Sequence, residues 1–286
     1  MNQFGTNHNK ILQQINQITH ADINQNYEQQ IWQIADWQNI TDIYDLISYF
    51  ENNIDDVKLF KYFYQHYELL VFKRPSVTID TVYLRYNVTL DRLQVYLTKR
   101  LHKPFKGQLA LPGSFLKENQ SINQAVITQT KRDLHINIKQ SQIINLPAVS
   151  KPGRDPRMWV ITNPNIVLLN PTQNAAGNWF ILQNRFTVKQ QLAFDHQTIL
   201  HSAFNYLKQD LDHQRLPLII KLLGPDITLP SLRDLLAHFE PKFKTQATAN
   251  ILKRYKQQLI KTDHKLKPPK GSKGGRSMSV YTYQNF

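Results

Sequence analysis

The sequence predicts an α+β protein in three parts, and three successive patterns along its 286 residues indicate this. Apolar residues recur at helical spacing over residues 1–74, which predicts a helical N-terminal module. Runs of β-branched and aromatic residues surround one helical run over residues 75–192, as in an α/β/α sandwich with a mixed sheet. Residues 193–286 return to helical spacing and end in a basic glycine loop and a strand, the outline of a winged helix-turn-helix.

The composition is that of a globular protein. Hydrophobic residues make up 41% of the chain, enough to bury cores in two or three domains. The absence of cysteine excludes disulfides and thiolate metal sites and fits a reducing cytoplasm. The N-terminus shows no signal peptide, and the longest apolar runs are too short to span a membrane. We therefore expect a cytoplasmic protein with no membrane partner.

Charge is distributed unevenly along the chain. Residues 1–70 hold three Lys against nine Asp or Glu, a net charge of −6, although the whole chain carries +14. Residues 241–286 hold eleven Lys or Arg against a single Asp, a net charge of +10. Such a basic C-terminus indicates a surface that faces nucleic acid, and a solubilising tail is the alternative.

The N-terminal module carries no recognisable chemistry. Apolar residues at positions 43, 46, 47 and 50 form the stripe of an amphipathic helix, and an earlier set at 11, 15 and 18 has similar spacing. Residues 58–72 are crowded with aromatic side chains and predict another helix. We expect a packing or dimerisation module of unknown role, and partner binding is the open alternative.

The middle part follows the order of an α/β sandwich. Strands are expected over residues 77–84, 93–97, 143–149 and 159–169. A hairpin connection at 87–92 joins the first two. Ser121, with Gln124 three residues on, has the pattern of a capping box and predicts the start of the helix between the strand pairs.

The C-terminal part is expected to hold three helices, over residues 196–211, 231–239 and 246–258. Asp195 and Thr228 stand where the N-caps of the first two would lie. A loop rich in Pro, Gly and Lys at 267–275 then precedes a strand at 279–283. This succession predicts a linker helix, a helix-turn-helix and a wing.

One segment looks like a Nudix box that has lost its acids. Residues 111–116, Leu-Pro-Gly-Ser-Phe-Leu, and the helix after them fit that frame, whose carboxylates hold divalent cations that activate water. Gln120 and Gln129 stand at two glutamate positions and Arg132 at a third, so that only Asp133 keeps a carboxylate. The sequence therefore predicts no metal, no cofactor, no catalytic residue and no enzyme activity.

The joined pattern resembles the Nudix-related transcriptional regulators of NAD metabolism, which pair an inactive Nudix-like sensor with a C-terminal winged helix. The resemblance covers about residues 76–286. It rests on pieces in the family's order, at residues 78–82, 99–100, 104–107, 109–115, 153–157, 192–196, 227–229 and 274–276. Ser114 in place of a second glycine departs from the family pattern, as does a recognition helix that lacks an Arg-rich start.

The resemblance implies a repressor whose affinity for a double-stranded DNA operator is set by ADP-ribose or a related NAD-derived nucleotide. Such repressors usually bind as homodimers to palindromic sites. Guanidinium groups form charge-assisted pairs with a diphosphate, although each arginine alone has the alternative of a surface ion pair. The residues expected to bind the nucleotide are Arg100, Phe115, Lys117, Arg132, Arg154, Asp155 and Arg157.

The recognition helix and the wing are expected to contact the operator. Gln and Asn suit adenine edges, while Arg and Lys suit guanine or phosphate. The expected DNA-binding residues are Thr245, Gln246, Thr248, Asn250, Lys253 and Arg254 in the helix and Lys267, Lys270, Lys273 and Arg276 in the wing.

Three alternatives stay open on the sequence alone. The first is a transcriptional regulator with a non-nucleotide ligand or with none. The second is a metal-dependent Nudix hydrolase, which the residues at the acid positions disfavour. The third is a non-catalytic scaffold that acts through the acidic N-terminal module.

Overall fold

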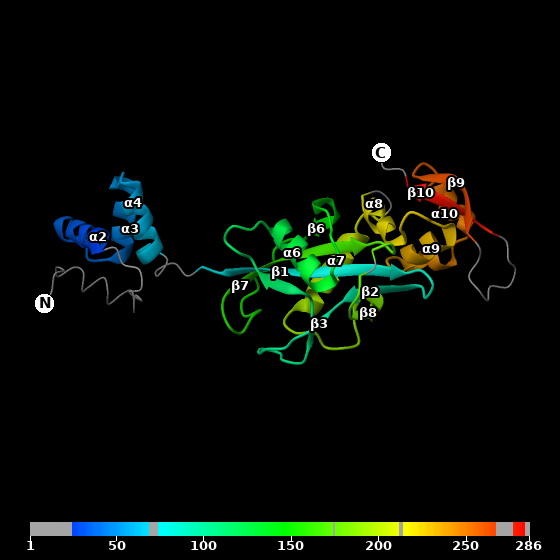
Figure 1. Ribbon diagram of the computed structural model, residues 1–286, viewed down its shortest axis with the longest axis horizontal. Helices are drawn as coiled ribbons and strands as arrows, with labels where there is room; N and C mark the ends of the chain where they lie inside the picture. Colours follow the sequence, from blue (N-terminus) through cyan, green and yellow to red (C-terminus); the bar gives the residue numbers. More distant parts are fainter. Residues whose placement is uncertain (1–24, 69–73, 174, 212–213, 267–276, 284–286) are drawn as a thin grey trace. The chain divides into compact units, whose positions relative to one another are not determined.

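The computed structural model describes residues 25–68, 74–173, 175–211, 214–266 and 277–283. The chain forms two compact units, residues 1–74 and 75–286 (Figure 1). The predicted boundary between residues 192 and 193 lies inside the second unit, and a division into sensor and DNA-binding domains there stays a prediction. No helix in the described part is long and apolar enough to cross a membrane.

The first unit is a small helical module. Its described elements are α2 (Gln25–Trp37), α3 (Ile43–Asn53), α4 (Val57–Phe63) and a π-helical turn (Tyr64–Glu68). Asp42 and Asp56 cap α3 and α4 by accepting hydrogen bonds from backbone N–H groups of the first turn. The apolar faces enclose a core of their own, in which the rings of Phe50 and Phe63 stack at 4.0 Å. The predicted helical spacing at residues 11–18 lies outside the described residues.

The second unit is built on a mixed sheet, as predicted. Its strands are β1 (Ser76–Asn87), β2 (Arg92–Tyr96), β5 (Gly113–Phe115), β6 (Ile143–Asn145), β7 (Val160–Leu169) and β8 (Trp179–Ile181). The order is β6-β7-β1-β2-β8, with β5 also paired to β1. The β1–β7 pair is parallel and the other pairs are antiparallel. Two short strands, β3 (Thr98–Lys99) and β4 (Leu109–Ala110), pair with each other beside it.

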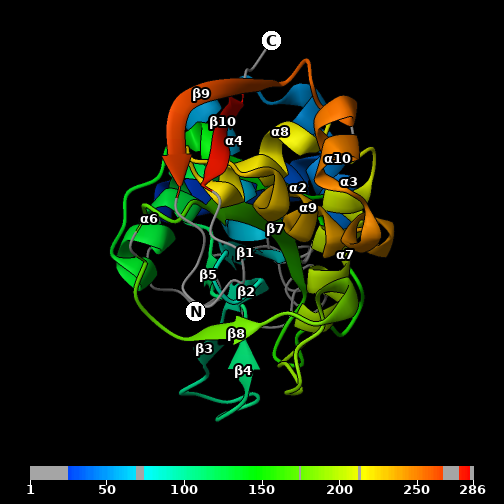
Figure 2. The ribbon, with the colours of Figure 1, turned by 90° about the vertical axis from the view of Figure 1, so that its right-hand side faces the viewer.

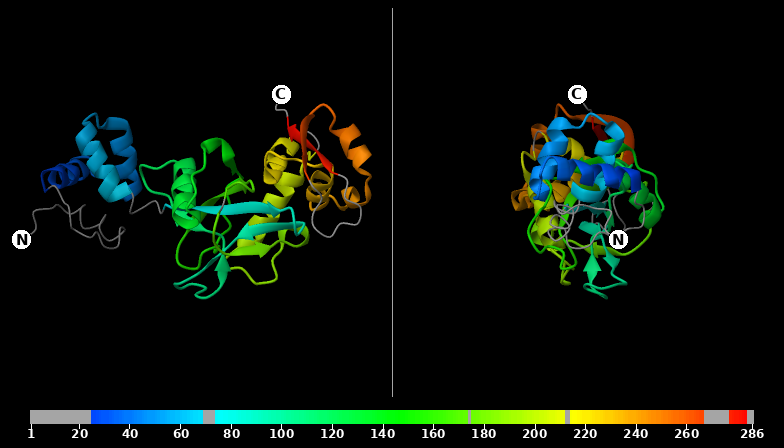
Figure 3. Two further views of the ribbon diagram at one scale, coloured as in Figure 1. Left: turned by 45° about the vertical axis from the view of Figure 1, so that its right-hand side comes forward. Right: turned by 90° about the vertical axis from the view of Figure 1, so that its left-hand side faces the viewer.

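Alternation along β1 directs its side chains to two helical layers. Ile79 and Tyr83 lie in a core with α6 (Ile122–Leu134). Leu84, one position on, lies in a second core with α7 (His196–Lys208). The sheet therefore separates the two helices, as the left view of Figure 3 shows, and the predicted α/β/α sandwich is confirmed. Whether a polar residue of β1 stands at an odd or an even position therefore decides which of the two helices its side chain faces.

Local signals identify the capping residues of two helices correctly, although the helix predicted over residues 231–239 spans Leu229–Ala237. Ser121 and Gln124 form the predicted reciprocal capping box at the start of α6. Thr228 caps α9 (Leu229–Ala237) by accepting a hydrogen bond from the backbone N–H of Ser231. The two residues of each cap lie within four positions of each other, so the cap can be predicted from the sequence alone.

The C-terminal end forms a helix-turn-helix and a strand hairpin (Figure 2). Its elements are α8 (Leu216–Ile219), η4 (Ile220–Leu223), α9, η5 (Pro241–Thr245), α10 (Thr248–Arg254), β9 (Leu259–Leu266) and β10 (Met278–Tyr283). The strands β9 and β10 pair antiparallel with each other. The core that packs against α7 continues through α9 and α10.

The predicted helix over residues 246–258 is wrong in its extent. The chain forms η5 before it, keeps only Thr248–Arg254 helical and enters β9 at Leu259. The prediction missed β9 because this strand pairs on one side only and exposes most of its side chains, so its sequence lacks clear alternation. The predicted helix over residues 196–211 likewise ends earlier, at Lys208.

Candidate ligand site and DNA-binding face

A cavity of about 260 Å³ opens beside the first half of β1. Thr78 and Asp80 of β1 line it together with the three residues of β5. His196, the first residue of α7, and residues of the loop at 154–157 also line it. The cavity thus joins the sheet to the start of the helix that leads toward the C-terminal elements.

A buried ionic cluster lies at this cavity. The Arg154 side chain is 4% exposed, and its Nη2 lies 2.8 Å from Asp195 Oδ1 and 3.1 Å from Asp80 Oδ2. Its Nε also donates to Asp195 Oδ2 at 3.1 Å. Asp195 does occupy the N-cap position of α7, but its side chain makes no capping hydrogen bond, contrary to the prediction. Its carboxylate pairs with the guanidinium because a buried charge needs a partner.

His196 holds the cluster from the opposite side. The backbone N–H of Leu111 donates to His196 Nδ1 at 2.8 Å, so the hydrogen-bond network places the ring hydrogen on Nε2. Nε2 lies 3.5 Å from Asp80 Oδ1. Burial raises the pKa of Asp80, but its interactions with His196 and Arg154 outweigh burial and bring the pKa below the ordinary 3.8. The carboxylate is therefore held ionised.

Two arginine–aromatic pairs stand at the cavity wall. The Arg100 guanidinium lies 4.5 Å from the centre of the Phe194 ring, and Arg157 lies 5.8 Å from that of Phe115. Asp155 pairs with Arg157 at 2.7 Å. Burial, and after it repulsion from Arg157, lowers the pKa of Arg100. An anion between the two guanidinium groups would relieve that repulsion.

The cavity brings together most of the residues predicted to bind a ligand. Those that line it are Arg100, Phe115, Arg154, Asp155 and Arg157. Lys117 and Arg132 are not among its lining residues. Arg132 belongs to α6, which packs on the other face of the sheet, and its guanidinium pairs with Asp133 at 2.6 Å. A role in nucleotide binding stays a prediction for all seven residues.

Sequence reasoning missed Asp80, Phe194 and His196 as lining residues. Asp80 offered a signal, because a carboxylate inside an apolar strand must find a buried partner. The two others precede or begin α7, and nothing in their local pattern marks them as part of a cavity.

The residues at the box positions do not fit a divalent cation. Gln129 is buried, and its Oε1 accepts a hydrogen bond of 2.7 Å from Thr81. The Gln120 amide lies 3.4 Å from the Thr128 hydroxyl. Such amides offer no charge to a cation, and Arg132 adds a repulsive one. Among the described residues no group of three or more acids or histidines is placed to hold a metal ion.

Four of the predicted DNA-binding residues of the recognition helix lie around one hollow at the C-terminal end. Gln246, Asn250, Lys253 and Arg254 border an open hollow along α10. Thr248 begins α10, and Thr245 ends the preceding η5. The predicted wing residues Lys267, Lys270, Lys273 and Arg276 lie outside the described residues.

Comparison with known proteins agrees with this architecture, although no family model matches the chain. The ADPR responsive transcriptional repressor NtrR of Acinetobacter baylyi is 27% identical over 180 residues, which are 60% of this chain and 70% of that one. An ADP-ribose pyrophosphatase of Methanocaldococcus jannaschii is 29% identical over 136 residues, 46% of this chain and 73% of that one.

Solved structures also resemble most of the chain. A MutT/nudix family protein from Enterococcus faecalis superposes with a TM-score of 0.68 at 26% identity, over 85% of this chain and 98% of that one. Shewanella oneidensis NrtR, complexed with a 27mer DNA, superposes with a TM-score of 0.60 at 25% identity, over 73% of this chain and 93% of that one.

Fold and site together define a Nudix-fold protein that carries a helix-turn-helix and an altered box. In sequence and in fold the chain is similar to the Nudix-related transcriptional regulators, as its sequence predicts.

Proposed function

We propose that the chain is a transcriptional repressor whose Nudix-like domain senses ADP-ribose or a related NAD-derived nucleotide. The observation that carries this proposal is a cavity with two arginine–aromatic pairs in the same compact unit as a helix-turn-helix. Guanidinium groups suit a diphosphate, and phenyl rings suit a planar base. The similarity to an ADPR responsive transcriptional repressor and to NrtR complexed with DNA supports both halves of the proposal.

We propose different roles for the arginines that line the cavity. Arg154 is already paired with two carboxylates, so it supports the cavity and orients the start of α7. Arg100 and Arg157 provide the charge that a diphosphate would meet. The proposed partners are an operator DNA and a second copy of the chain, since two-fold repressors bind two half-sites. We place this activity in the cytoplasm and assign it no resident cofactor.

We further propose that the protein is not a hydrolase, although one relative is an ADP-ribose pyrophosphatase. With Gln120, Gln129 and Arg132 at the box positions, no saturable Mg²⁺- or Mn²⁺-dependent turnover of ADP-ribose is expected. The measurement is product release at several substrate concentrations, with Asp133→Asn as the comparison. Saturable hydrolysis that this substitution abolishes would make the protein an enzyme and refute this part of the proposal.

Binding to DNA is expected to depend strongly on salt. If about six phosphates are neutralised, the logarithm of the affinity should fall with the logarithm of salt concentration at a slope near −5. Lys253→Ala on α10 should reduce that slope by about one. Lys131→Ala, an exposed lysine on α6, is the matched control and should leave it unchanged. Equal slopes for the two variants would place the DNA elsewhere than on α10.

A further inference from the structure

The hairpin between β1 and β2 extends from the sheet to the helix-turn-helix. Figure 1 shows β1 running toward α9, and the left view of Figure 3 shows the same approach. Asn87 orders the turn by accepting a hydrogen bond of 3.0 Å from the backbone N–H of Leu90. Asp91 follows in the left-handed region at φ 50, a conformation that aspartate tolerates better than most residues. The turn thereby presents the Asp91 carboxylate to the C-terminal helices.

The Asp91 carboxylate contacts both sides of the turn in the helix-turn-helix. Its Oδ1 lies 2.9 Å from Nε2 of His238, the C-cap residue of α9. Its Oδ2 accepts a hydrogen bond of 2.7 Å from Nζ of Lys244 in η5. The Tyr86 hydroxyl donates to Oδ1 at 2.9 Å and fixes the carboxylate from the sheet side. One side chain thus connects β1, the end of α9 and the segment before α10.

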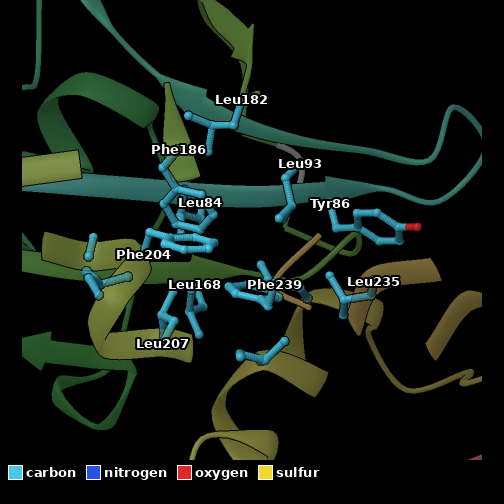
Figure 4. Packing of buried hydrophobic residues seen from close by; sticks show 14 of the residues in the cluster. Leu84, Tyr86, Leu93, Leu168, Leu182, Phe186, Phe204, Leu207, Leu235 and Phe239 are labelled. Atoms are coloured by element: carbon cyan, nitrogen blue, oxygen red, sulfur yellow. The ribbon is translucent and has the colours of Figure 1, made fainter. Parts of the chain in front are cut away.

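These polar contacts lie beside an apolar interface. Tyr86 and Leu93 of the hairpin share a core with Leu235 and Phe239, as Figure 4 shows. The Tyr86 and His238 rings meet edge to face at 5.7 Å. Apolar packing is non-directional and leaves small rotations free. Hydrogen bonds depend on angle, so the carboxylate supplies the orientation that packing alone does not.

The charge on Asp91 fits this role. Its side chain is 29% exposed. Burial raises the pKa of Asp91, but hydrogen bonds from Lys244, Tyr86 and His238 outweigh burial and lower it. The carboxylate is therefore ionised at neutral pH and neutralises a lysine that stands directly before the recognition helix.

We propose that Asp91 is a positioning residue that fixes the orientation of the helix-turn-helix on the Nudix-like sheet. The same strand β1 carries Thr78 and Asp80 at the cavity and ends at this hairpin. A ligand that shifts β1 would therefore move α9 and η5 through Asp91. This coupling rests on the proposed function, whereas the orienting role of Asp91 does not.

A distance measurement tests the orienting role without DNA or ligand. The chain has no cysteine, so the substitutions Lys131→Cys on α6 and Lys256→Cys after α10 give two unique spin-label sites. Pulsed electron spin resonance, on samples diluted with unlabelled protein, measures the distance between them. Asp91→Asn should broaden the distance distribution relative to the wild type. Asp226→Asn, the same change at an exposed site of the same unit, should leave it narrow.

A second variant controls for the possibility that Asp91→Asn disturbs the hairpin rather than the contact with the helix-turn-helix. Lys244→Met removes the partner of Oδ2, leaves β1 and β2 unaltered and should also broaden the distribution. Narrow, wild-type distributions in both variants would overturn the proposal. In parallel, an ADP-ribose effect of about tenfold on DNA affinity should fall below about twofold in Asp91→Asn. No ADP-ribose effect in the wild type would refute the proposed function, while the distances would still decide the role of Asp91.

Discussion

Replacing Arg154 with methionine is expected to lower the free energy of unfolding by about 3–5 kcal/mol. The substitution leaves Asp80 and Asp195 side by side, with side chains only 8% and 14% exposed and without their shared cation. A buried charge without a partner is among the few causes of so large a loss. Urea denaturation followed by circular dichroism measures it as a shift of the midpoint at unchanged slope.

Arg157→Met is the matched control, because this arginine is 39% exposed and pairs with a single carboxylate. Its removal should cost no more than about 1 kcal/mol, as for other exposed pairs.

The stabilisation by Asp80 is expected to depend on pH. The folded-state pKa of Asp80 is lowered, so the contribution of this carboxylate to stability is present above the ordinary 3.8 and is lost as pH falls through the lowered pKa. Equal stabilities of Arg154→Met and wild type at pH 7 would contradict the assigned cluster.

Gly113→Ala is expected to weaken ADP-ribose binding by tenfold or more. A Cβ at residue 113 would stand 2.6 Å from Asp80 Oδ1 and 3.1 Å from the Ile79 carbonyl oxygen. Asp80 has little room to give way, because Arg154 and His196 both hold it. Overpacking of this kind costs about 1–3 kcal/mol, and here the strain falls on the cavity lining. Isothermal titration calorimetry with ADP-ribose measures the loss.

Ser114→Ala is the control for this prediction. Ser114 lies next to Gly113 in β5 and lines the same cavity, but its substitution adds no atoms. Binding to this variant should stay within about threefold of the wild type, which corresponds to less than 1 kcal/mol. If Gly113→Ala bound ADP-ribose as tightly as Ser114→Ala, the nucleotide would not occupy this cavity.

The features predicted from the sequence are those with short-range signals. The capping residues Ser121 and Thr228 lie three residues from their partners, so they locate the starts of α6 and α9. The altered Nudix box can be recognised in the sequence because the motif fixes the spacing between its acidic positions. Runs of β-branched and aromatic residues likewise predicted β1 and β7.

The features that the sequence did not predict depend on contacts between distant residues. Arg154 pairs with Asp80 and Asp195, which lie 74 and 41 positions away along the chain. No local pattern shows that these partners occupy the guanidinium, which is why we propose a supporting role for Arg154. That Arg132 lies on α6 and does not line the cavity becomes visible only when it is known on which face of the sheet α6 packs. The contact of Asp91 with Lys244 joins residues 153 positions apart, so the sequence does not predict it either.

We propose that a nucleotide in the Nudix-like domain changes DNA affinity at the helix-turn-helix. Fluorescence anisotropy with DNA from upstream of the protein's own gene, with and without saturating ADP-ribose, tests it most directly. We expect specific binding whose affinity shifts about tenfold, or roughly 1.4 kcal/mol, within the usual range of coupling between two sites. Specific binding that saturating ADP-ribose leaves unchanged would refute this coupling.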